Sequence, residues 1–384
     1  MWNRIKENSI VLFIILATVI VTVLLQNFSF QSYSRFSSDT LHYEKAVVVE
    51  VSDESLEYDE GLEIYLGTQD LKVEMLDGEE EGSVLEVTNY LTQTHNVYAQ
   101  EGTKLIINAD RPENADPYYS VYNFDRTVPM AACFAVLAAA IICIGKGKGV
   151  RAIAGLAYSM FMVIYLVLPA VFSGYSPIGM SILCGILSTA VTLLLLNGQS
   201  EKTWAAILST TVGVICSLLF FLIMSGLVHL DGFSSSEAEG LVLISQETGL
   251  KIKDVLFAGV LISSLGAIMD TGMSIVSALY EVYTHNPGLN TRELFLSGIE
   301  MGKDMIGTMT NTLILAFTGS AFITLLVFLS YQVQVNQLFN SNYLTIEIAQ
   351  GICGSFGIVI TVPAASLITA AFLVRKKAEK IKEK

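Results

Sequence analysis

The feature that most constrains this chain is a series of apolar runs that are long enough to cross a membrane. Val11–Leu25 and Ala131–Ile144, for example, contain no charged residue. Across the whole chain 52% of the residues are hydrophobic and 15% are charged, whereas soluble domains average about 45–50% and about 25%. We therefore expect an integral membrane protein surrounded by the lipid bilayer, and the composition excludes a soluble enzyme.

Eight segments approach the length of about 20 apolar residues that a transmembrane helix needs, so the sequence predicts a membrane α-helical bundle of about eight spans. The first segment follows Arg4 and Lys6, but no small-x-small cleavage site follows it in Gln26–Phe30. We therefore expect an uncleaved anchor rather than a signal peptide. The predicted spans are residues 9–25, 128–145, 152–172, 178–197, 204–225, 254–281, 304–329 and 346–374.

Basic residues near the span ends predict the orientation, because Lys and Arg are enriched in cytoplasmic loops. With the N-terminus inside, 14 of the 22 basic residues fall on short cytoplasmic loops and tails. Lys251 and Lys253 are the exceptions, since they precede the sixth span on the outer side. We expect a multi-pass protein of the plasma (inner) membrane with both termini inside and residues 26–127 outside.

The segment 26–127 differs sharply in charge from the rest of the chain. It holds 21 acidic and 6 basic residues, a net charge of −15, whereas the remainder carries +1. So acidic a surface excludes nucleic acid as a partner, because phosphate binding needs basic side chains. Alternating or β-branched runs at 46–51, 71–76, 83–87 and 104–107 predict strands. We expect a small extracytoplasmic β-rich domain, either a barrel or OB-like.

Two other stretches of the acidic segment are informative. Residues 111–126 are rich in Pro, Asn, Asp and Tyr and predict a tether back to the membrane. The run Asp77–Glu81 lacks the ligand spacing of a calcium loop, so we expect a solvated hairpin turn there. The predicted parts of the chain are an anchor (1–25), the outer β domain with its tether (26–127), a seven-span bundle (128–374) and a basic cytoplasmic tail (375–384).

The sequence contains no catalytic or metal-binding pattern. All five cysteines lie in apolar runs, and the four histidines are scattered over loops and the outer domain. There is no CxxC pair, Walker A motif, GxSxG elbow or dinucleotide fingerprint. We therefore expect neither an enzyme nor a metal site, and no cofactor other than a bound proton or monovalent cation.

One acidic residue lies deep inside a predicted span. If the sixth span covers about 257–279, Asp270 is within a turn of the bilayer midplane. Small and polar residues at steps of three or four share its helix face, and such a stripe typically packs against other helices rather than lipid. The stripe consists of Gly259, Ser263, Gly266, Asp270, Ser274, Ser277 and Glu281.

The seventh span begins with a matching stripe that includes Asp304, Thr308 and Asn311. At about 1.5 Å per residue, Asn311 lies within several ångström of the depth of Asp270, so we expect the two to be within reach of each other. Asp304 follows Lys303 and is also interpretable as half of an interfacial charge pair.

Two further elements complete the predicted site. Residues 291–295 follow an Asn-Pro-Gly turn and predict a short helix along the inner membrane surface. The eighth span contributes Gly351 and Gly354 for close helix packing, and Pro363, which favours a kink.

Two interpretations of Asp270 are open. No Lys or Arg lies in the hydrocarbon zone of any predicted span, so the carboxyl group is either protonated or bound to a cation. The functional interpretation is proton- or ion-coupled transport, with Thr308, Asn311, Ser274 and Asp304 as further candidates. The structural interpretation is a permanently protonated side chain that hydrogen-bonds a neighbouring helix.

At these residues the chain resembles the YibE/F family. The resemblance implies a bacterial membrane protein from a family without an established biochemical activity, so it names no substrate. It rests on the segments Asp254–Asp270, Asn286–Leu289, Gly302–Ala316 and Ile360–Pro363, and on Val73–Gly78 and Val87–Asn89 of the outer domain.

The order of the parts is also similar to that of half an RND transporter or of SecF, in which an intramembrane acid relays protons. This chain departs in having eight predicted spans where such a half has six. We expect a permease or export component for an unknown small substrate, with Asp270 as its proton or ion site. The alternative is a non-transporting scaffold or assembly factor whose outer domain binds another envelope protein. A homo- or hetero-oligomer is compatible with both.

Overall fold

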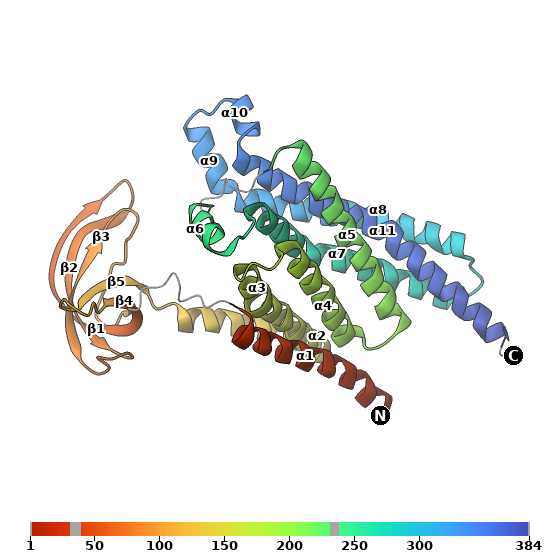
Figure 1. Cartoon of the computed structure of the whole chain (residues 1–384), viewed down its shortest axis with the longest axis horizontal. Helices are drawn as coiled ribbons and strands as arrows, with labels where there is room; N and C mark the ends of the chain where they lie inside the picture. Colours follow the sequence, from red (N-terminus) through yellow and green to blue (C-terminus); the bar gives the residue numbers. More distant parts are fainter. Residues whose placement is uncertain (1, 31–39, 231–237, 383–384) are drawn as a thin grey trace. The chain divides into compact units, whose positions relative to one another are not determined.

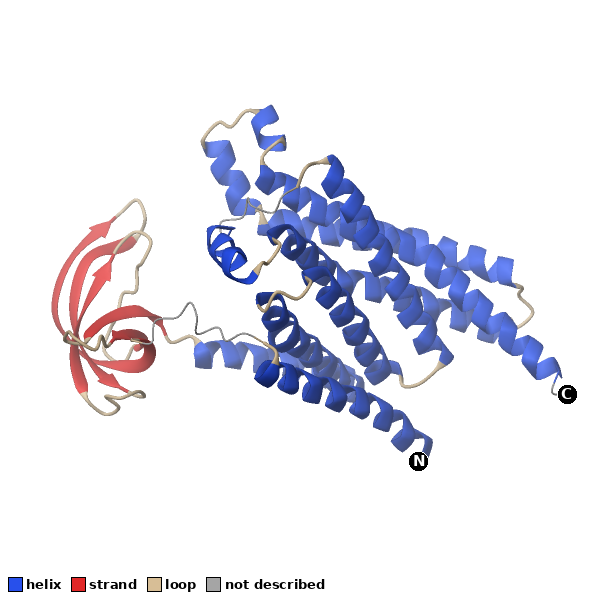
Figure 2. Cartoon of the chain, viewed as in Figure 1, coloured by secondary structure: helices blue, strands red, loops and turns tan. Residues whose placement is uncertain are grey.

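A computed structural model describes residues 2–30, 40–230 and 238–382 of the chain (Figure 1). The chain divides into two compact units, a helical one formed by Met1–Gln31 and Ile141–Lys384 and a second one formed by Ser32–Ala140. The strands of the second unit are distinct from the helices in Figure 2. The predictions of a helical membrane body and a separate β-rich domain are confirmed at this level.

The second unit contains a curled antiparallel sheet of five strands: β1 (Leu41–Asp59), β2 (Ile64–Met75), β3 (Val84–Leu91), β4 (Lys104–Asp110) and β5 (Tyr118–Phe124). Their order in the sheet is β3-β2-β1-β4-β5. The pairing of β1 with β2 shifts register between Val48 and Glu50 and again between Val51 and Asp53. Such bulges bend a strand and increase its twist. The sheet curls enough for its edge strands, β3 and β5, to contact each other.

Alternation along the strands builds the core of this sheet. In β4 the side chains of Leu105, Ile107 and Ala109 are fully buried, and the residues between them are not. Leu105 and Ile107 pack in one cluster with Val73 and Met75 of β2. Because each buried aliphatic side chain contributes about 1.5–3 kcal/mol, this pattern is what holds the sheet in one register.

The prediction of a tether over residues 111–126 is wrong, because β5 occupies most of its second half. Val121 of β5 is buried and is the register partner of Ile107 in β4. The flanking Pro and Asp residues gave the segment the composition of a loop. Val121 nevertheless supplies the buried side chain of this edge strand, and Tyr119 and Phe124 pack partly buried against the same core.

Several helices of the helical unit are longer than the spans predicted from the sequence. The first part of α2, up to Ala140, belongs to the second unit. The helices of the chain are α1 (Trp2–Phe28), α2 (Thr127–Phe161), the π-helix η2 (Met162–Val167), α3 (Leu168–Phe172), α4 (Pro177–Asn197), α5 (Glu201–Leu227), α6 (Ala238–Thr248), α7 (Ile252–His285), α8 (Thr291–Ser320), α9 (Phe322–Ser330), α10 (Val335–Phe339) and α11 (Asn342–Lys382).

The helix α2 reverses direction at Lys146, whose φ of 48° and ψ of −128° lie outside the helical region. A Cβ added to Gly149 would lie 2.3 Å from the carbonyl oxygen of Ile141. Residues eight apart in a straight helix are separated by about 12 Å, so the chain folds back here. The two arms correspond to the predicted spans 128–145 and 152–172.

Among the described residues, five helical segments are long and apolar enough to cross a membrane, and a sixth is added if α8 and α9 form one span. This count treats the two arms of α2, together with η2 and α3, as a single segment. It also leaves out α1, whose apolar stretch Val11–Asn27 is shorter. The prediction of eight spans therefore stays a prediction.

The helix α8 corrects another expectation. It runs without interruption from Thr291 to Ser320, so residues 291–295 do not form a separate surface helix. The predicted start is right: Glu293 N–H donates to Asn290 Oδ1 over 3.0 Å, and Asn290 N–H donates to the Glu293 carboxylate over 2.9 Å. No proline follows to stop the helix. It ends only at Ala321, where α9 departs at 55°.

The helix α11 packs against α5, α7 and α8. Small residues permit this close approach. A Cβ on Gly302 of α8 would lie 2.1 Å from Cγ1 of Val362, and one on Gly213 of α5 would lie 1.9 Å from Oγ1 of Thr361. Backbones that approach so closely gain van der Waals contact without help from the hydrophobic effect, as helices in a membrane must.

Candidate functional site

Asp270 lies near the centre of α7, eighteen residues after Ile252 and fifteen before His285. A helix of 34 residues is about 51 Å long, which exceeds the roughly 30 Å of a bilayer's hydrocarbon core. If the middle of α7 lies in the membrane, Asp270 therefore lies deep in the hydrocarbon core. Its side chain is exposed on the surface of the chain. Among the described residues it makes no hydrogen bond or ion pair.

The predicted stripe on α7 faces outward from the chain. Gly259, Ser263, Gly266 and Ser274 are exposed, like Asp270. A Cβ added to Gly259 or Gly266 would meet no described atom within 4 Å. In the described structure these two glycines therefore do not pack against another helix of the same chain. The buried residues of α7, such as Ile268, Thr271 and Ile275, lie on other faces of the helix.

Two close contacts relate the depths of α7 and α8. A Cβ on Gly298 would lie 3.0 Å from Leu279, and one on Gly354 of α11 would touch both Leu313 and Ser264. Leu279 and Ser264 are fifteen residues apart on α7, as Gly298 and Leu313 are on α8. The two helices therefore run antiparallel at matched depth. Asp270 is nine residues before Leu279, and Gly307 is nine residues after Gly298, so the two lie at the same depth. Thr308 is the next residue of α8.

The sequence predicted that Asn311 lies within several ångström of the depth of Asp270, and Thr308 lies closer to that depth. The hydroxyl of Thr308 donates to the carbonyl oxygen of Asp304 or of Met305, each 3.2 Å away, and both Thr308 and Asn311 are exposed. Lys303 pairs with Glu300, not with Asp304, at 2.6 Å. Within the described chain these groups are exposed polar side chains along one stretch of α8, and none of them forms a hydrogen bond or ion pair with α7.

The three predicted residues of α11 lie in different surroundings. Gly354 is buried where α11 meets α7 and α8, since a Cβ there would lie 2.5 Å from Leu313 and 3.1 Å from Ser264. Gly351 is buried one turn earlier and lines a cavity. Pro363 lies inside α11, which the structure gives as one continuous helix.

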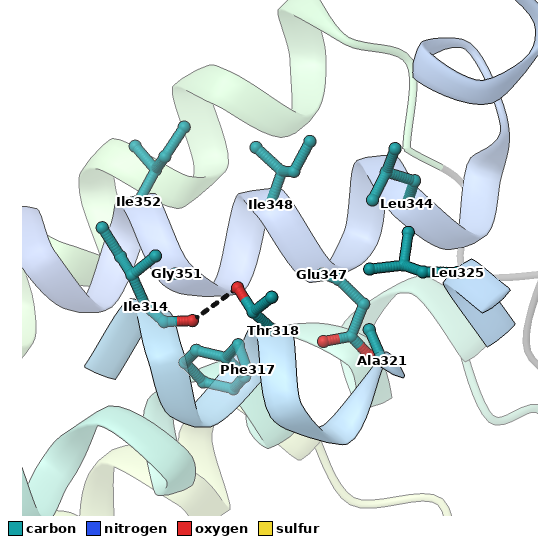
Figure 3. Close-up of a pocket in the computed structure, with 10 residues that line it drawn as sticks. All are labelled: Ile314, Phe317, Thr318, Ala321, Leu325, Leu344, Glu347, Ile348, Gly351 and Ile352. Atoms are coloured by element: carbon teal, nitrogen blue, oxygen red, sulfur yellow. Dashed lines mark hydrogen bonds between the residues drawn. The ribbon is translucent and has the colours of Figure 1, made fainter. Parts of the chain in front are cut away.

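Sequence reasoning missed a cavity that forms where α8 breaks from α9 and both face the beginning of α11 (Figure 3). Its volume is about 250 Å³. Glu347 is the single acidic residue of the lining, and its Oε2 is shut off from solvent with no hydrogen-bond partner in the described structure. The cavity is lined by Ile314, Phe317, Thr318, Ala321, Leu325, Leu344, Glu347, Ile348, Gly351 and Ile352.

Comparison with known families identifies this helical body. A model of the family described as YibE/F-like protein matches residues 133–375. The chain belongs to the YibE/F family. No curated protein and no solved structure matches it. The matched range contains Asp270, Thr308 and Glu347, and it leaves the five-stranded sheet outside.

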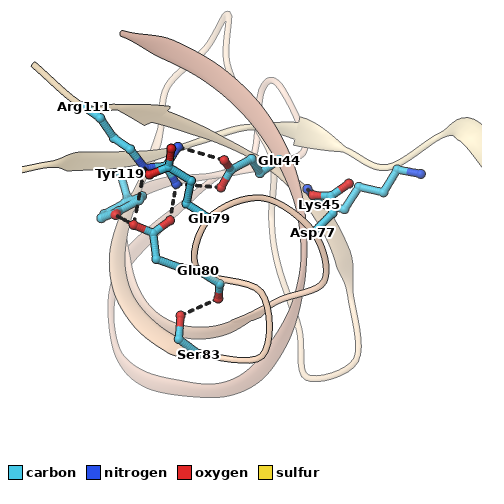
Figure 4. Close-up of polar contacts among 8 residues, drawn as sticks. All are labelled: Glu44, Lys45, Asp77, Glu79, Glu80, Ser83, Arg111 and Tyr119. Atoms are coloured by element: carbon cyan, nitrogen blue, oxygen red, sulfur yellow. Dashed lines mark hydrogen bonds and ion pairs between the residues drawn. The ribbon is translucent and has the colours of Figure 1, made fainter.

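The sheet domain of this YibE/F-family protein has a buried ionic cluster of its own, which the sequence did not reveal (Figure 4). Arg111, directly after β4, donates to both carboxylate oxygens of Glu44, each at 2.8 Å. It also contacts Glu80, whose other oxygen accepts a 2.6 Å hydrogen bond from Tyr119. The run Asp77–Glu81 is therefore not simply a solvated turn, because Glu80 turns inward to Arg111.

The charges of this cluster stabilise one another. Hydrogen bonds from Arg111, and to a lesser degree from Tyr119, lower the pKa of Glu80, and the hydrogen bonds to Glu44 and Glu80 raise the pKa of Arg111. Burial, followed by the interaction with Glu80, raises the pKa of Tyr119. Glycine is required at position 78, where φ is +91°, since a Cβ there would lie 2.1 Å from the Glu44 carboxyl carbon.

No group of His, Cys, Asp and Glu residues suited to a metal ion occurs in the part of the chain that the structure describes.

Proposed function

We propose that this YibE/F-family protein is a permease or export component in which Asp270 binds a proton or a monovalent cation. The observation that carries the proposal is the isolation of Asp270 halfway along α7. A carboxyl group in a membrane is expensive unless it is neutralised. No described basic residue or hydrogen-bond donor of the chain neutralises this one, so a proton or a bound cation is the remaining means.

The neighbouring helix supports the same assignment. Thr308 lies at the depth of Asp270, and Asn311 lies about one turn further along α8, where each offers an oxygen. Carboxylate, hydroxyl and amide oxygens suit a hard monovalent cation. In this proposal Asp270 is the titrating group, Thr308, Asn311 and Ser274 are accessory ligands, and Asp304 lies at the entrance to the stripe.

The proposal includes the membrane arrangement predicted by the basic residues. Eight spans cross the bacterial inner membrane, both termini are cytoplasmic, and the sheet domain is outside. Because α2 reverses at Lys146, its two arms would account for two of these spans, and α8 with α9 for another.

A thermal-shift experiment tests the ion site without knowledge of the substrate. The purified full chain is melted over a range of pH and in Na⁺ or K⁺, with Asp270→Asn and the control Glu281→Gln, an exposed acid at the end of the same helix. A ligand that binds only the folded state raises the melting temperature. Because other acids titrate in all three proteins, we expect a component of the shift with pH, or a shift with one cation, that the wild type and Glu281→Gln share and that Asp270→Asn lacks. Identical curves for all three proteins would refute the site.

A second function is favoured by one observation, the exposed glycines on α7. Gly259 and Gly266 offer a flat face to a helix from another protein, as a membrane scaffold or assembly factor requires. Under that alternative Asp270→Asn fails to accumulate because a partner contact is lost. Deleting the whole sheet, residues 41–124, is then the more damaging change. Under the transport proposal the Asn variant accumulates normally.

A further inference from the structure

The geometry points to a binding site for a small organic cation, an ammonium group on an apolar body, in the cavity between the α8–α9 break and α11. This site is separate from Asp270 and does not depend on transport. Three features of the cavity carry the inference: an acid with one oxygen that accepts no hydrogen bond, walls that are otherwise apolar, and an opening on the exposed side of the helices.

The acid is Glu347, in the second turn of α11, whose side chain points toward Ala321 at the helix break (Figure 3). Its Oε2 is inaccessible to solvent and accepts no hydrogen bond, and the hydroxyl of Ser320 is within hydrogen-bonding reach of the carboxyl group. A buried acceptor without a donor costs free energy that a ligand donor recovers. No Lys, Arg or His belongs to the lining. A donor that carries positive charge would satisfy this oxygen and also balance the charge of the carboxylate.

The rest of the lining selects for an apolar body. Thr318 is the other polar side chain, and its hydroxyl already donates to the carbonyl oxygen of Ile314 over 2.8 Å. Phe317 supplies an aromatic ring, a surface that attracts organic cations. A hydrated metal ion would find no second oxygen ligand of comparable charge among these walls, whereas an amine with a hydrocarbon part matches both the acid and its surroundings.

The size and opening of the cavity narrow the ligand further. Its volume of about 250 Å³ is below the range of about 300–1,000 Å³ that is usual for drug-sized ligands. At the rim, Ile314, Ile348 and Ile352 are 44%, 40% and 44% exposed. In a membrane these side chains face lipid, so a ligand would enter from the bilayer. A compact amphiphilic amine satisfies both conditions.

The space for the ligand depends on Gly351 and on the bend at Ala321. A Cβ on Gly351 would lie 3.8 Å from Ile314 and 3.9 Å from Phe317, which are ordinary contacts. Alanine is therefore tolerated at this position, and leucine projects into the cavity. This difference supplies a matched pair of variants that leaves Glu347 unchanged.

The test measures binding of radiolabelled 2-phenylethylammonium to the full chain in nanodiscs of zwitterionic lipid at neutral pH. The uncharged competitor is 2-phenylethanol, which has the same apolar body. The variants are Glu347→Gln and Gly351→Leu. Their controls are Glu300→Gln, an exposed acid on α8, and Gly351→Ala.

We expect the wild type and both controls to bind the ammonium at least about tenfold more tightly than the alcohol, since a hydrogen bond to a charged group is worth about 1.5–3 kcal/mol. Glu347→Gln should abolish this preference, and Gly351→Leu should weaken binding of both ligands. Equal affinity of the wild type for the two ligands, or an unchanged preference in Glu347→Gln, would overturn the inference. If Glu347→Gln does not fold, unchanged ammonium binding by Gly351→Leu overturns it instead. Binding that persists in Asp270→Asn separates this site from the proposed ion site.

Discussion

The two units of this protein differ in how they pair carboxyl groups that are buried in the chain or that a bilayer would shield from water. In the sheet domain, Glu44 and Glu80 converge on Arg111, and each carboxylate has a charged hydrogen-bond partner. In the helical unit, Asp270 and one oxygen of Glu347 have no partner in the described structure. Both units contain acidic residues at positions where water is scarce or would be replaced by lipid, but only one of them neutralises those residues internally.

The difference separates acids that stabilise the fold from acids available to a ligand. A carboxylate held by Arg111 on both oxygens already has a charged partner within the chain, so it needs no ligand or ion to stabilise it. An acid without a partner keeps its hydrogen-bonding capacity at the cost of desolvation, which selection tolerates where a ligand or ion restores the balance. Three predictions test this separation, beginning with the largest expected effect.

Replacing Arg111 with Met should destabilise the sheet domain by about 3 kcal/mol or more, because the change leaves Glu44, which is 7% exposed, charged and unpaired. Hydrogen exchange of the β1 and β4 amides in the full chain measures the loss directly. The α7 and α11 amides should exchange as in the wild type.

The matched control is Lys72→Met, which breaks the ion pair with Glu50 on the surface of the same sheet, where the two side chains are 36% and 51% exposed. No measurable change is expected, since water replaces the partner of an exposed charge. Similar exchange rates for Arg111→Met and Lys72→Met would show that the Arg111 cluster does not stabilise the domain.

The sheet shows which parts of the fold were readable from the sequence. The runs at 46–51, 71–76, 83–87 and 104–107 lie in or overlap the first four strands, because period-two alternation directly specifies which side chains enter the core. The last strand was missed. It has only Val121 fully inside, too little alternation to outweigh the Pro and Asp residues beside it.

The helical unit shows a different limit. Hydropathy located α7 and singled out Asp270, since a lone charge in a long apolar helix is visible in the sequence. It did not show that the stripe around Asp270 faces outward, because periodicity gives a helix face but not its neighbours. Glu347 was missed for a related reason. It lies at the edge of a predicted span, where acids are common, and only the bend at Ala321 turns that position into a cavity.

The second prediction concerns acid. Interaction with Arg111 lowers the pKa of Glu80 in the folded domain below its ordinary value of 4.5. The unfolded state therefore takes up the proton first as pH falls. The stability that Glu80 contributes is present above pH 4.5 and is lost as pH falls through the lowered folded pKa. The effect should be smaller than that of Arg111→Met, since protonation leaves the fold without an orphaned charge.

Circular dichroism melts of the β-sheet signal between pH 3 and pH 7 would measure this loss, with Glu80→Gln as the variant. In Glu80→Gln the fall in melting temperature on acidification should be shallower, because the titrating group is gone. An equally steep fall in both proteins would assign the acid sensitivity to other carboxylates of the domain.

The smallest expected effect is on the other side of the comparison. Asp270→Asn and Glu347→Gln should each change the stability of the helical unit by no more than about 0.5 kcal/mol, because neither removes an ion pair within the chain. Thermal melts of the full protein, followed by the helical signal, give the values. In buffer without Na⁺ or K⁺, removing an acid that lacks a partner in the chain relieves desolvation, so any change should be toward higher stability. A loss of several degrees in Asp270→Asn in that buffer would mean that its carboxyl group already has a partner other than a cation, which, since the described chain offers none, would be a helix of another molecule. The same result for Glu347→Gln would mean that Glu347, like Glu44, stabilises the fold. The contrast between the two units would then no longer hold.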